Sequence, residues 1–309
     1  MRVLVLGARG AVGRAVSDHL RRMGHTVTGV GRTMTPPGMP LDLSTGEGLT
    51  GLRAAADEYD VVVNASGIED PALVACTGEV PFVEISATGA YLESLAVTGS
   101  ATTLVLGAGL APGATTILAA ALPAVPGDDV DVAISLGSGE THGNAAVEWT
   151  AGLVGRTIHR PPEAEPVPNL HETRRFRTEA GIRTHLRADF PDHVLIGVPR
   201  GVAVRSYLAV SSRLATAALA VAGRLPVLAP LISRAPHWGD RCWEVSATHR
   251  RTGRRLSARG VGQSHATALL TAHAAVAAAT APRRGPVPMS ELVTVAELRE
   301  MDGIEFGES

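Results

Sequence analysis

Three glycines near the start of the chain have the spacing of a phosphate-binding turn. Gly7, Gly10 and Gly13 form the pattern G-x-x-G-x-x-G. The first glycine permits a tight turn, the second lets the backbone approach a pyrophosphate, and the third allows a helix to pack closely on a strand. N–H groups at the start of that helix would bind the pyrophosphate. The predicted contacts come from Gly7, Arg9, Gly10, Ala11, Val12 and Gly13.

The residues at positions 30–33 predict which dinucleotide binds. A carboxylate in this window commonly pairs with the ribose hydroxyls of NAD, but the sequence reads Val-Gly-Arg-Thr and contains no acid. Arg32 is placed to stack on adenine and to pair with a 2′-phosphate, with Arg9 joining it and Thr33 donating a hydroxyl. The alternative is two solvated arginines. The sequence therefore favours NADP over NAD.

Candidate acid–base groups follow a predicted strand much farther along the chain. Glu140 and His142 occur in the tract Gly-Glu-Thr-His-Gly, and Glu148 comes shortly after it. The ordinary pKa of histidine lies near neutral pH, so His142 could exchange the proton that accompanies hydride transfer. The alternative is a histidine that caps or packs against a helix start. We therefore expect His142 and Glu140 to be catalytic and Glu148 to contact the substrate.

Two further pairs are two residues apart, so each pair would share one face of a strand. Arg205 and Tyr207 could bind a substrate carboxylate and donate a hydrogen bond to the substrate, although an ordinary ion pair explains Arg205 equally well. Glu84 and Ser86 lie at the end of a predicted strand, where ligands bind in open α/β sheets. Tyr207 is therefore a catalytic candidate, Arg205 a substrate-binding one and Ser86 a cofactor-binding one.

The elements that would position these residues alternate between strands and helices. We predict a strand at residues 2–6, because residues 3–6 are continuously apolar, which is typical of a buried parallel strand. Apolar residues then recur at helical spacing from Val12 to Met23, Gly24 ends the predicted helix, and residues 26–30 form the next strand. Further strands are predicted at residues 61–63, 82–85 and 103–106, with helices at residues 71–77 and after Pro112.

This order predicts an α/β protein whose N-terminal half is a Rossmann domain with a doubly wound parallel sheet. Alternating apolar residues from about Asp128 onward indicate a second α+β domain at about 121–259. An alanine-rich helix at residues 265–281 would return to the first domain, which we place at 1–120 plus about 260–309. Four prolines in residues 160–169 predict an exposed loop.

Composition excludes several classes of function. Among the 28 basic residues none is lysine, so a Schiff base, a lysine acid and a Tyr-x-x-x-Lys pair are all impossible. The net charge of −2 and the aromatic content of 3% disfavour a nucleic-acid partner. Cys76 and Cys242 lack nearby metal ligands, so we expect two buried free thiols and no metal. The apolar stretch 214–232 contains Arg224 and two prolines, which predicts a packing helix and turn instead of membrane insertion.

Four tracts resemble the saccharopine dehydrogenase-like oxidoreductase family. They are GARGAVG at 7–13, YDVVVNASG at 59–67, PFVEISATGAYLESL at 81–95 and LVLGAGLAPGATT at 104–116. Weaker matches continue through the second domain. The resemblance implies an inserted substrate domain, and it implies cofactor contacts at Asn64, Ala65, Ser66, Gly67, Gly107, Gly109 and Pro112. The lack of lysine argues against saccharopine itself as the substrate.

The resulting expectation is NADP(H)-dependent reduction of a carbonyl, imine or activated double bond in a small metabolite. Two alternatives stay open. One is a redox-neutral epimerase or rearrangement enzyme that borrows and returns a hydride, and the other is a non-catalytic NADP(H) sensor. The N-terminus lacks the features of a secretory signal, so a cytoplasmic location is expected, and a homodimer is a possible assembly.

Overall fold

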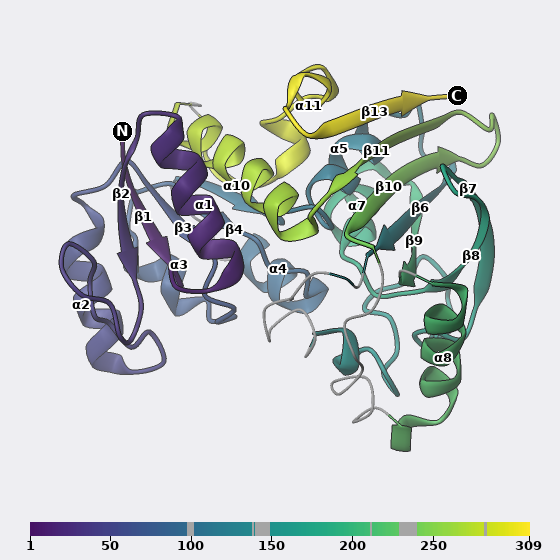
Figure 1. The fold of residues 1–309 in the computed structure, drawn as a ribbon, viewed down its shortest axis with the longest axis horizontal. Helices are drawn as coiled ribbons and strands as arrows, with labels where there is room; N and C mark the ends of the chain where they lie inside the picture. Colours follow the sequence, from purple (N-terminus) through teal and green to yellow (C-terminus); the bar gives the residue numbers. More distant parts are fainter. Residues whose placement is uncertain (98–101, 138, 140–148, 211, 229–239, 281–282) are drawn as a thin grey trace. The chain divides into compact units, whose positions relative to one another are not determined.

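The computed structural model describes residues 1–97, 102–137, 139, 149–210, 212–228, 240–280 and 283–309 (Figure 1). These residues divide into two compact units. The first unit contains Met1–Gly113 and Ser264–Thr294, and the second contains Ala114–Gln263 and Val295–Ser309.

The first unit is built on a parallel sheet of six strands. The strands run in the order β12-β5-β4-β3-β1-β2, and every neighbouring pair is parallel. The side chains of Val3–Leu6 in β1 and of β3 are at most 1% exposed because helices cover both faces of such a sheet. Their bounds are β1 (Arg2–Leu6), β2 (Thr26–Val30), β3 (Val61–Asn64), β4 (Phe82–Glu84), β5 (Thr103–Leu106) and β12 (Gly285–Pro288).

The helices of this unit connect the strands in the way the sequence predicts, with two additions. Helix α1 buries Val16 and Leu20 and stops before Gly24, which has a φ of 85°. Helix α2, which our sequence analysis did not predict, is capped by the Thr45 hydroxyl accepting from the Gly48 amide. The helices are α1 (Ala11–Arg22), α2 (Gly46–Ala56), α3 (Ala72–Cys76), the likewise unpredicted α4 (Gly89–Ala96), α10 (Gln263–Thr280) and the short turn η3 (Met289–Glu291).

The sheet contains a point where the strand order reverses. From β1 the chain first adds β2 on one side and later β3 on the other. Ligands of open α/β sheets bind at the carboxyl ends of the strands that flank such a point. Here those ends lead into Gly7 and into Ala65.

The second unit is built on a mixed sheet of seven strands in the order β13-β11-β10-β6-β9-β8-β7. Only β6 and β9 pair in parallel; the other pairs of this sheet are antiparallel. The strands are β6 (Asp129–Leu136), β7 (Thr173–Thr178), β8 (Gly181–Arg187), β9 (Ala203–Val210), β10 (Cys242–His249), β11 (Arg255–Val261) and β13 (Ile304–Glu308). Its helical segments are α5 (Ala114–Ala121), the π-helical turn η1 (His193–Gly197), α7 (Val198–Arg200), α8 (Arg213–Arg224), η2 (Pro226–Leu228) and α11 (Val295–Glu300).

Strand β6 gives the two faces of this sheet opposite characters. Val130, Val132 and Ile134 lie on the face against which α5 packs, and they are at most 1% exposed. Asp129 and Asp131 alternate with them and therefore lie on the other face. The sheet thus has one apolar face and one face that carries charged groups.

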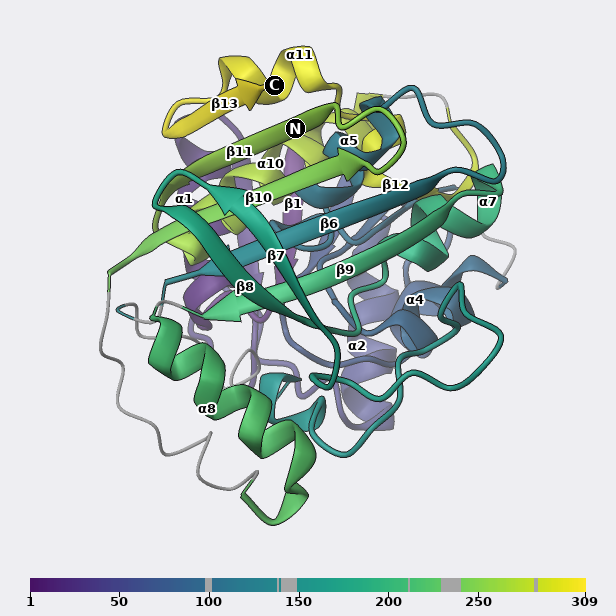
Figure 2. The ribbon, with the colours of Figure 1, turned by 90° about the vertical axis from the view of Figure 1, so that its right-hand side faces the viewer.

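The hairpin of β7 and β8 folds across the charged face. In the sheet, β7 is separated from β6 by two strands, yet Arg174 of β7 contacts Asp131 of β6 at 2.9 Å. His185 Nε2 also lies 2.9 Å from the Ser135 hydroxyl of β6. Figure 2 shows β7 and β8 crossing over β6 and β9. Phe176 of the hairpin packs with Ala133 and Tyr207 beneath it.

The fold class predicted from the sequence is confirmed, with two corrections of detail. The segment after Thr294 belongs to the second unit and not to the first, because β13 pairs with β11. Cys76 is buried as expected, but Cys242 is exposed. The packing helix and turn predicted from residue 214 onward correspond to α8, which ends at Arg224, and to η2, which starts at Pro226. None of the helices in the described part of the chain could span a membrane.

Candidate functional site

The turn after β1 has the shape that a pyrophosphate needs. Gly7 has a φ of 73°, and a Cβ atom there would lie 2.6 Å from the carbonyl oxygen of Ala65. A Cβ atom on Gly13 would lie 2.8 Å from the carbonyl carbon of Gly7. A side chain at either position is therefore excluded by backbone, and the start of α1 packs directly on the turn.

Gly10 differs from Gly7 and Gly13 because a Cβ atom there would come no closer than 3.3 Å to the backbone. It is exposed, and a Cβ atom there would meet only the Gly7 carbonyl oxygen at 3.3 Å and the Ala65 carbonyl oxygen at 4.0 Å. It precedes α1, which begins at Ala11 without a hydrogen bond from any capping side chain. The first N–H groups of a helix need an acceptor and carry positive potential. A dinucleotide pyrophosphate fits this cradle.

Two of the residues predicted to select NADP are in contact. The Arg9 guanidinium donates to the carbonyl oxygen of Thr33 at 3.2 Å and to its hydroxyl. Arg32 is exposed and forms no hydrogen bond with any other described residue. Thus Arg9 and Thr33 join the glycine turn to the segment after β2, and the guanidinium of Arg32 retains its donors.

Asp42 is an acid near this group that our sequence analysis missed. The Ser44 hydroxyl and amide donate to its carboxylate and lower its pKa, and the charge of Arg32 lowers it further. Asp42 comes ten residues after Arg32 in the sequence, so no local pattern indicated that the two charges interact. Asp42 therefore adds negative charge beside a predicted phosphate-binding arginine.

The ends of β3 and β4 are joined by a buried hydrogen-bond network. Asn64 is 1% exposed, and its amide nitrogen donates to Glu84 at 2.7 Å and to the Ile68 carbonyl at 3.0 Å. Its amide oxygen accepts from the backbone N–H and hydroxyl of Ser66. The side chain of Asn64 is thus committed to the loop at Ala65, Ser66 and Gly67, so it shapes that loop from within the protein.

Glu84 is the titratable centre of this network. It is 2% exposed and accepts from the Ser86 amide at 2.8 Å and the Tyr91 hydroxyl at 3.1 Å. Burial raises the pKa of Glu84 to about 7, although the hydrogen bonds from Asn64, Ser86 and Tyr91 act in the opposite direction. Ser86 itself is only partly buried, and its hydroxyl donates to Glu69. The carboxyl group of Glu84 can therefore change charge near neutral pH.

The turn after β5 is fixed by close backbone contacts. The Gly109 amide donates to the Pro112 carbonyl at 2.9 Å, and Gly107 has a φ of 68°. Gly113 has a φ of 133°, and a Cβ atom there would lie 2.6 Å from the Gly109 nitrogen. Helix α10 supports the turn, since the Thr271 hydroxyl donates to the Ala108 carbonyl at 2.7 Å. The turn therefore presents backbone at the same edge of the sheet as Gly7.

The predicted acid–base residues Glu140, His142 and Glu148 lie outside the described residues. Arg205 and Tyr207 lie on β9 in the second unit, and they share a face as predicted. Arg205 donates to Asp129 and to Glu163, which is the ion pairing that our sequence analysis left open. Tyr207 is 3% exposed, and its hydroxyl accepts from Arg250 at 3.4 Å.

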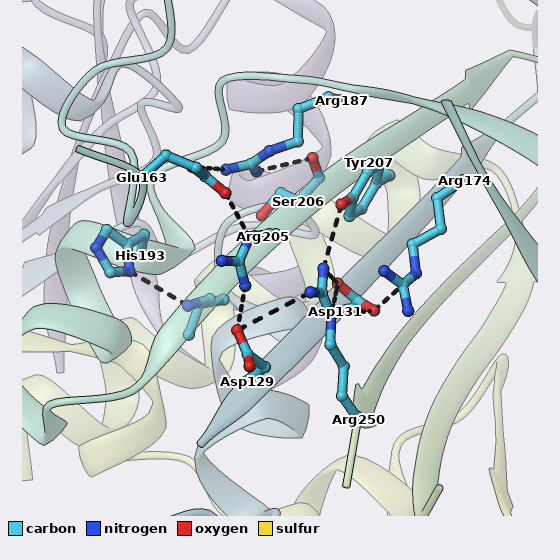
Figure 3. A network of polar contacts seen from close by, with 11 residues as sticks. Asp129, Asp131, Glu163, Arg174, Arg187, His193, Arg205, Ser206, Tyr207 and Arg250 are labelled. Atoms are coloured by element: carbon cyan, nitrogen blue, oxygen red, sulfur yellow. Dashed lines mark hydrogen bonds and ion pairs between the residues drawn. The ribbon is translucent and has the colours of Figure 1, made fainter. Parts of the chain in front are cut away.

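Arg205 belongs to a chain of alternating charges on the polar face of the second sheet (Figure 3). Arg187 contacts Glu163 at 3.3 Å. Arg205 forms ion pairs with both Glu163 and Asp129. Arg250 lies 3.9 Å from Asp129 and 2.7 Å from Asp131, to which Arg174 also pairs. These residues come from four strands and two connecting segments. Only their two-residue alternation along each strand was visible in the sequence, so Arg174 and Arg250 were missed.

Among the described residues no group of three or more His, Cys, Asp and Glu side chains could hold a metal ion.

Neither a family model nor a curated protein matches the chain. Several solved structures are similar to it. One is the apo histidine-tagged saccharopine dehydrogenase (L-Glu forming) of Saccharomyces cerevisiae, with a TM-score of 0.65 and 12% identity over 100% of this chain and 99% of the other. Another is a mutant meso-DAP dehydrogenase of Clostridium tetani with DAP, at a TM-score of 0.47 and 11% identity over 97% and 99% of the two chains.

The saccharopine dehydrogenase similarity concerns the fold. It extends over the whole chain, so it includes the parallel sheet, the inserted mixed sheet and the returning helix α10. The resemblance predicted from the four sequence tracts is thereby confirmed at the level of fold.

Proposed function

We propose that this protein is an NADP(H)-dependent oxidoreductase that reduces a carbonyl, imine or activated double bond of a small metabolite. The observation that carries the proposal is the glycine turn at the reversal of strand order. Gly7 and Gly13 fit only without side chains, while Gly10 is exposed and lies at the uncapped start of α1. That combination matches a pyrophosphate site.

The reaction class rests on a second, independent support. The fold similarity over the full chain is to a saccharopine dehydrogenase, which by its name transfers reducing equivalents. A bound nicotinamide would supply the hydride. The protein would bind and orient that cofactor, and we assign this role to the turn residues named above together with Asn64, Ala65, Ser66, Gly67, Ser86, Gly107, Gly109 and Pro112.

Selection of NADP is assigned to Arg32, with Arg9 and Thr33 in support. A guanidinium with unused donors suits a 2′-phosphate, whereas NAD offers a neutral hydroxyl there. The negative charge of Asp42 would repel the 2′-phosphate in part. The preference for NADPH therefore requires the positive charge of Arg32. Proton delivery is assigned to His142 with Glu140, and substrate contact to Glu148, on the chemistry of their side chains.

The cofactor assignment is tested by fluorescence titration with NADPH and NADH. The wild type should bind NADPH more tightly, and Arg32→Ala should bring the two affinities within about threefold by removing a charge-assisted contact. Arg53→Ala is the matched control, because Arg53 is an exposed arginine on α2. Unchanged NADPH preference in Arg32→Ala would reject Arg32 as the selecting residue.

The reaction class is tested by incubating the protein with NADPH and panels of keto acids, imines and enones. Steady substrate-dependent loss of absorbance at the nicotinamide band supports net reduction. Substrate conversion without net loss of NADPH would instead indicate a redox-neutral reaction. His142→Ala should lower the rate of turnover and leave NADPH affinity unchanged, because its assigned role is proton transfer.

A further inference from the structure

A polar hollow lies in the second unit, beside the charge chain of Figure 3. Its volume is about 370 Å³, which is enough for a small organic molecule. Three arginines and a tyrosine supply most of its lining. The full lining is Glu172, Thr173, Arg174, Arg205, Tyr207 and Arg250.

The arginines are held in place by carboxylates. Asp131 is 2% exposed. Its carboxylate accepts hydrogen bonds from Nε of Arg250, at 2.9 and 3.0 Å, and from Nη2 of Arg250, at 2.7 Å. Arg174 reaches the same carboxylate through its Nε at 2.9 Å. A guanidinium has five N–H donors, so the two terminal nitrogens of Arg174 retain theirs. The hollow is therefore lined by oriented cations.

Tyr207 adds a hydroxyl hydrogen that is not donated to any of the described residues. Its hydroxyl oxygen accepts from Arg250 at 3.4 Å, and the ring is fixed between Phe176 and the guanidinium of Arg187. A hydroxyl that accepts through its oxygen still has its own hydrogen to donate. Tyr207 can thus hydrogen-bond to an anion held by Arg174 and Arg250.

The charge count favours a singly charged ligand. The four arginines 174, 187, 205 and 250 exceed the carboxylates of Asp129, Asp131 and Glu163 by one. Glu172 also lines the hollow, and because water screens the charges of the exposed Glu172 and Arg174 in part, the net charge of the cluster lies between zero and plus one. So small a positive charge matches a carboxylate better than a dianionic phosphate.

We propose that this hollow binds the carboxylate of a small organic acid, with Arg174, Arg250 and Tyr207 as the contacting residues. Guanidinium groups pair with carboxylates through two parallel hydrogen bonds. The site uses residues of the second unit only, so it does not depend on the proposed cofactor and can be tested without it.

The test is ligand-observed NMR of the full-length wild-type protein with ¹³C-carboxylate-labelled acetate and glycolate. Acetamide serves as the neutral analogue and inorganic phosphate as the competing anion. Saturable binding of the carboxylates is expected, with no binding of acetamide and weaker binding of phosphate. Lack of saturable carboxylate binding, or tighter binding of phosphate, would overturn the proposal.

Two variants separate ligand binding from a purely structural ion-pair network. Arg174→Ala should weaken carboxylate binding about tenfold, since it removes a charge-assisted donor, while Asp131 keeps its contacts with Arg250. Arg175→Ala is the control, because this exposed neighbour points to the opposite side of β7. Tyr207→Phe should weaken binding about fivefold through loss of one hydroxyl. Equal affinity in the wild type, Arg174→Ala and Tyr207→Phe would reject the site.

Discussion

The amide nitrogen of Asn64 lies 2.7 Å from Oε2 of Glu84, and this hydrogen bond joins the carboxyl ends of two adjacent strands. The same asparagine accepts from Ser66, whose Cα lies against Gly7. One buried carboxyl group thus supports the loop that touches the proposed pyrophosphate turn. Its ionisation should be visible in the stability of the protein.

The contribution of Glu84 to stability should fall as pH rises from about 4.5 to about 7, because the pKa of Glu84 increases from 4.5 to about 7 on folding. Below this window the carboxyl group is neutral in both states; within it, the unfolded chain releases a proton that the folded protein retains. The contribution of Glu84 to the free energy of unfolding should decrease by roughly 3 kcal/mol across this range. Urea denaturation at a series of pH values measures it.

Glu84→Gln isolates this contribution. His19 and His185 have pKa values lowered to about 4, chiefly by burial, and they act in the opposite direction below pH 6.5. Both histidines remain in the variant, so the difference between the two pH profiles reports on Glu84. The difference should change across pH 4.5–7. Parallel profiles over this range would show that Glu84 keeps an ordinary pKa.

Gly13→Ala should destabilise the first unit by roughly 2 kcal/mol, because the new Cβ atom would collide with the backbone of Gly7. Gly46→Ala provides the control. Gly46 is the first residue of α2, and a Cβ atom there meets nothing within 4 Å. Its stability should stay the same or rise slightly, since alanine favours helices. Thermal denaturation followed by circular dichroism compares the two. Equal stabilities would contradict close packing of α1 on the turn.

Asp131→Asn should lower the free energy of unfolding by about 3 kcal/mol, because Arg250 loses its buried counter-charge. Glu305→Gln breaks the contact of an exposed pair, in which the glutamate side chain is 69% exposed and Arg259 also contacts Glu179. Its cost should stay below about 1 kcal/mol. Urea denaturation at pH 7 measures both. A similar small loss for both variants would mean that the charge chain contributes little to stability.

Local patterns were sufficient to predict most of the first unit. The apolar run at Val3–Leu6, the helical spacing through Leu20 and the glycines at 7, 10 and 13 each act within a few residues. Helix α2 was missed because its sequence, GEGLTGLRAAA, contains three glycines that disfavour a helix. Its Thr45 cap and the buried Leu52 outweigh that preference.

The polar site of the second unit depends on contacts that no local pattern reveals. Asp131 and Arg250 are 119 residues apart in the sequence, and the hairpin that carries Arg174 folds back over the sheet. The pairing of Arg205 with Glu163 likewise joins a strand to a proline-rich loop. Alternation predicted that Arg205 and Tyr207 share a face, but it could not identify the residues opposite them.

The most direct test of the proposed cofactor site is a fluorescence titration of NADPH into the wild type and into Gly10→Ala. The alanine methyl group would lie at the proposed cradle, and its nearest contact, 3.3 Å from the Gly7 carbonyl oxygen, requires a shift of a few tenths of an ångström. We predict saturable binding of one NADPH per chain to the wild type. In Gly10→Ala we expect at least about tenfold weaker binding, with a smaller fall in melting temperature than in Gly13→Ala. If the wild type bound neither NADPH nor NADH, or if Gly10→Ala bound NADPH as tightly as the wild type, the assignment of this turn as the dinucleotide site would be wrong.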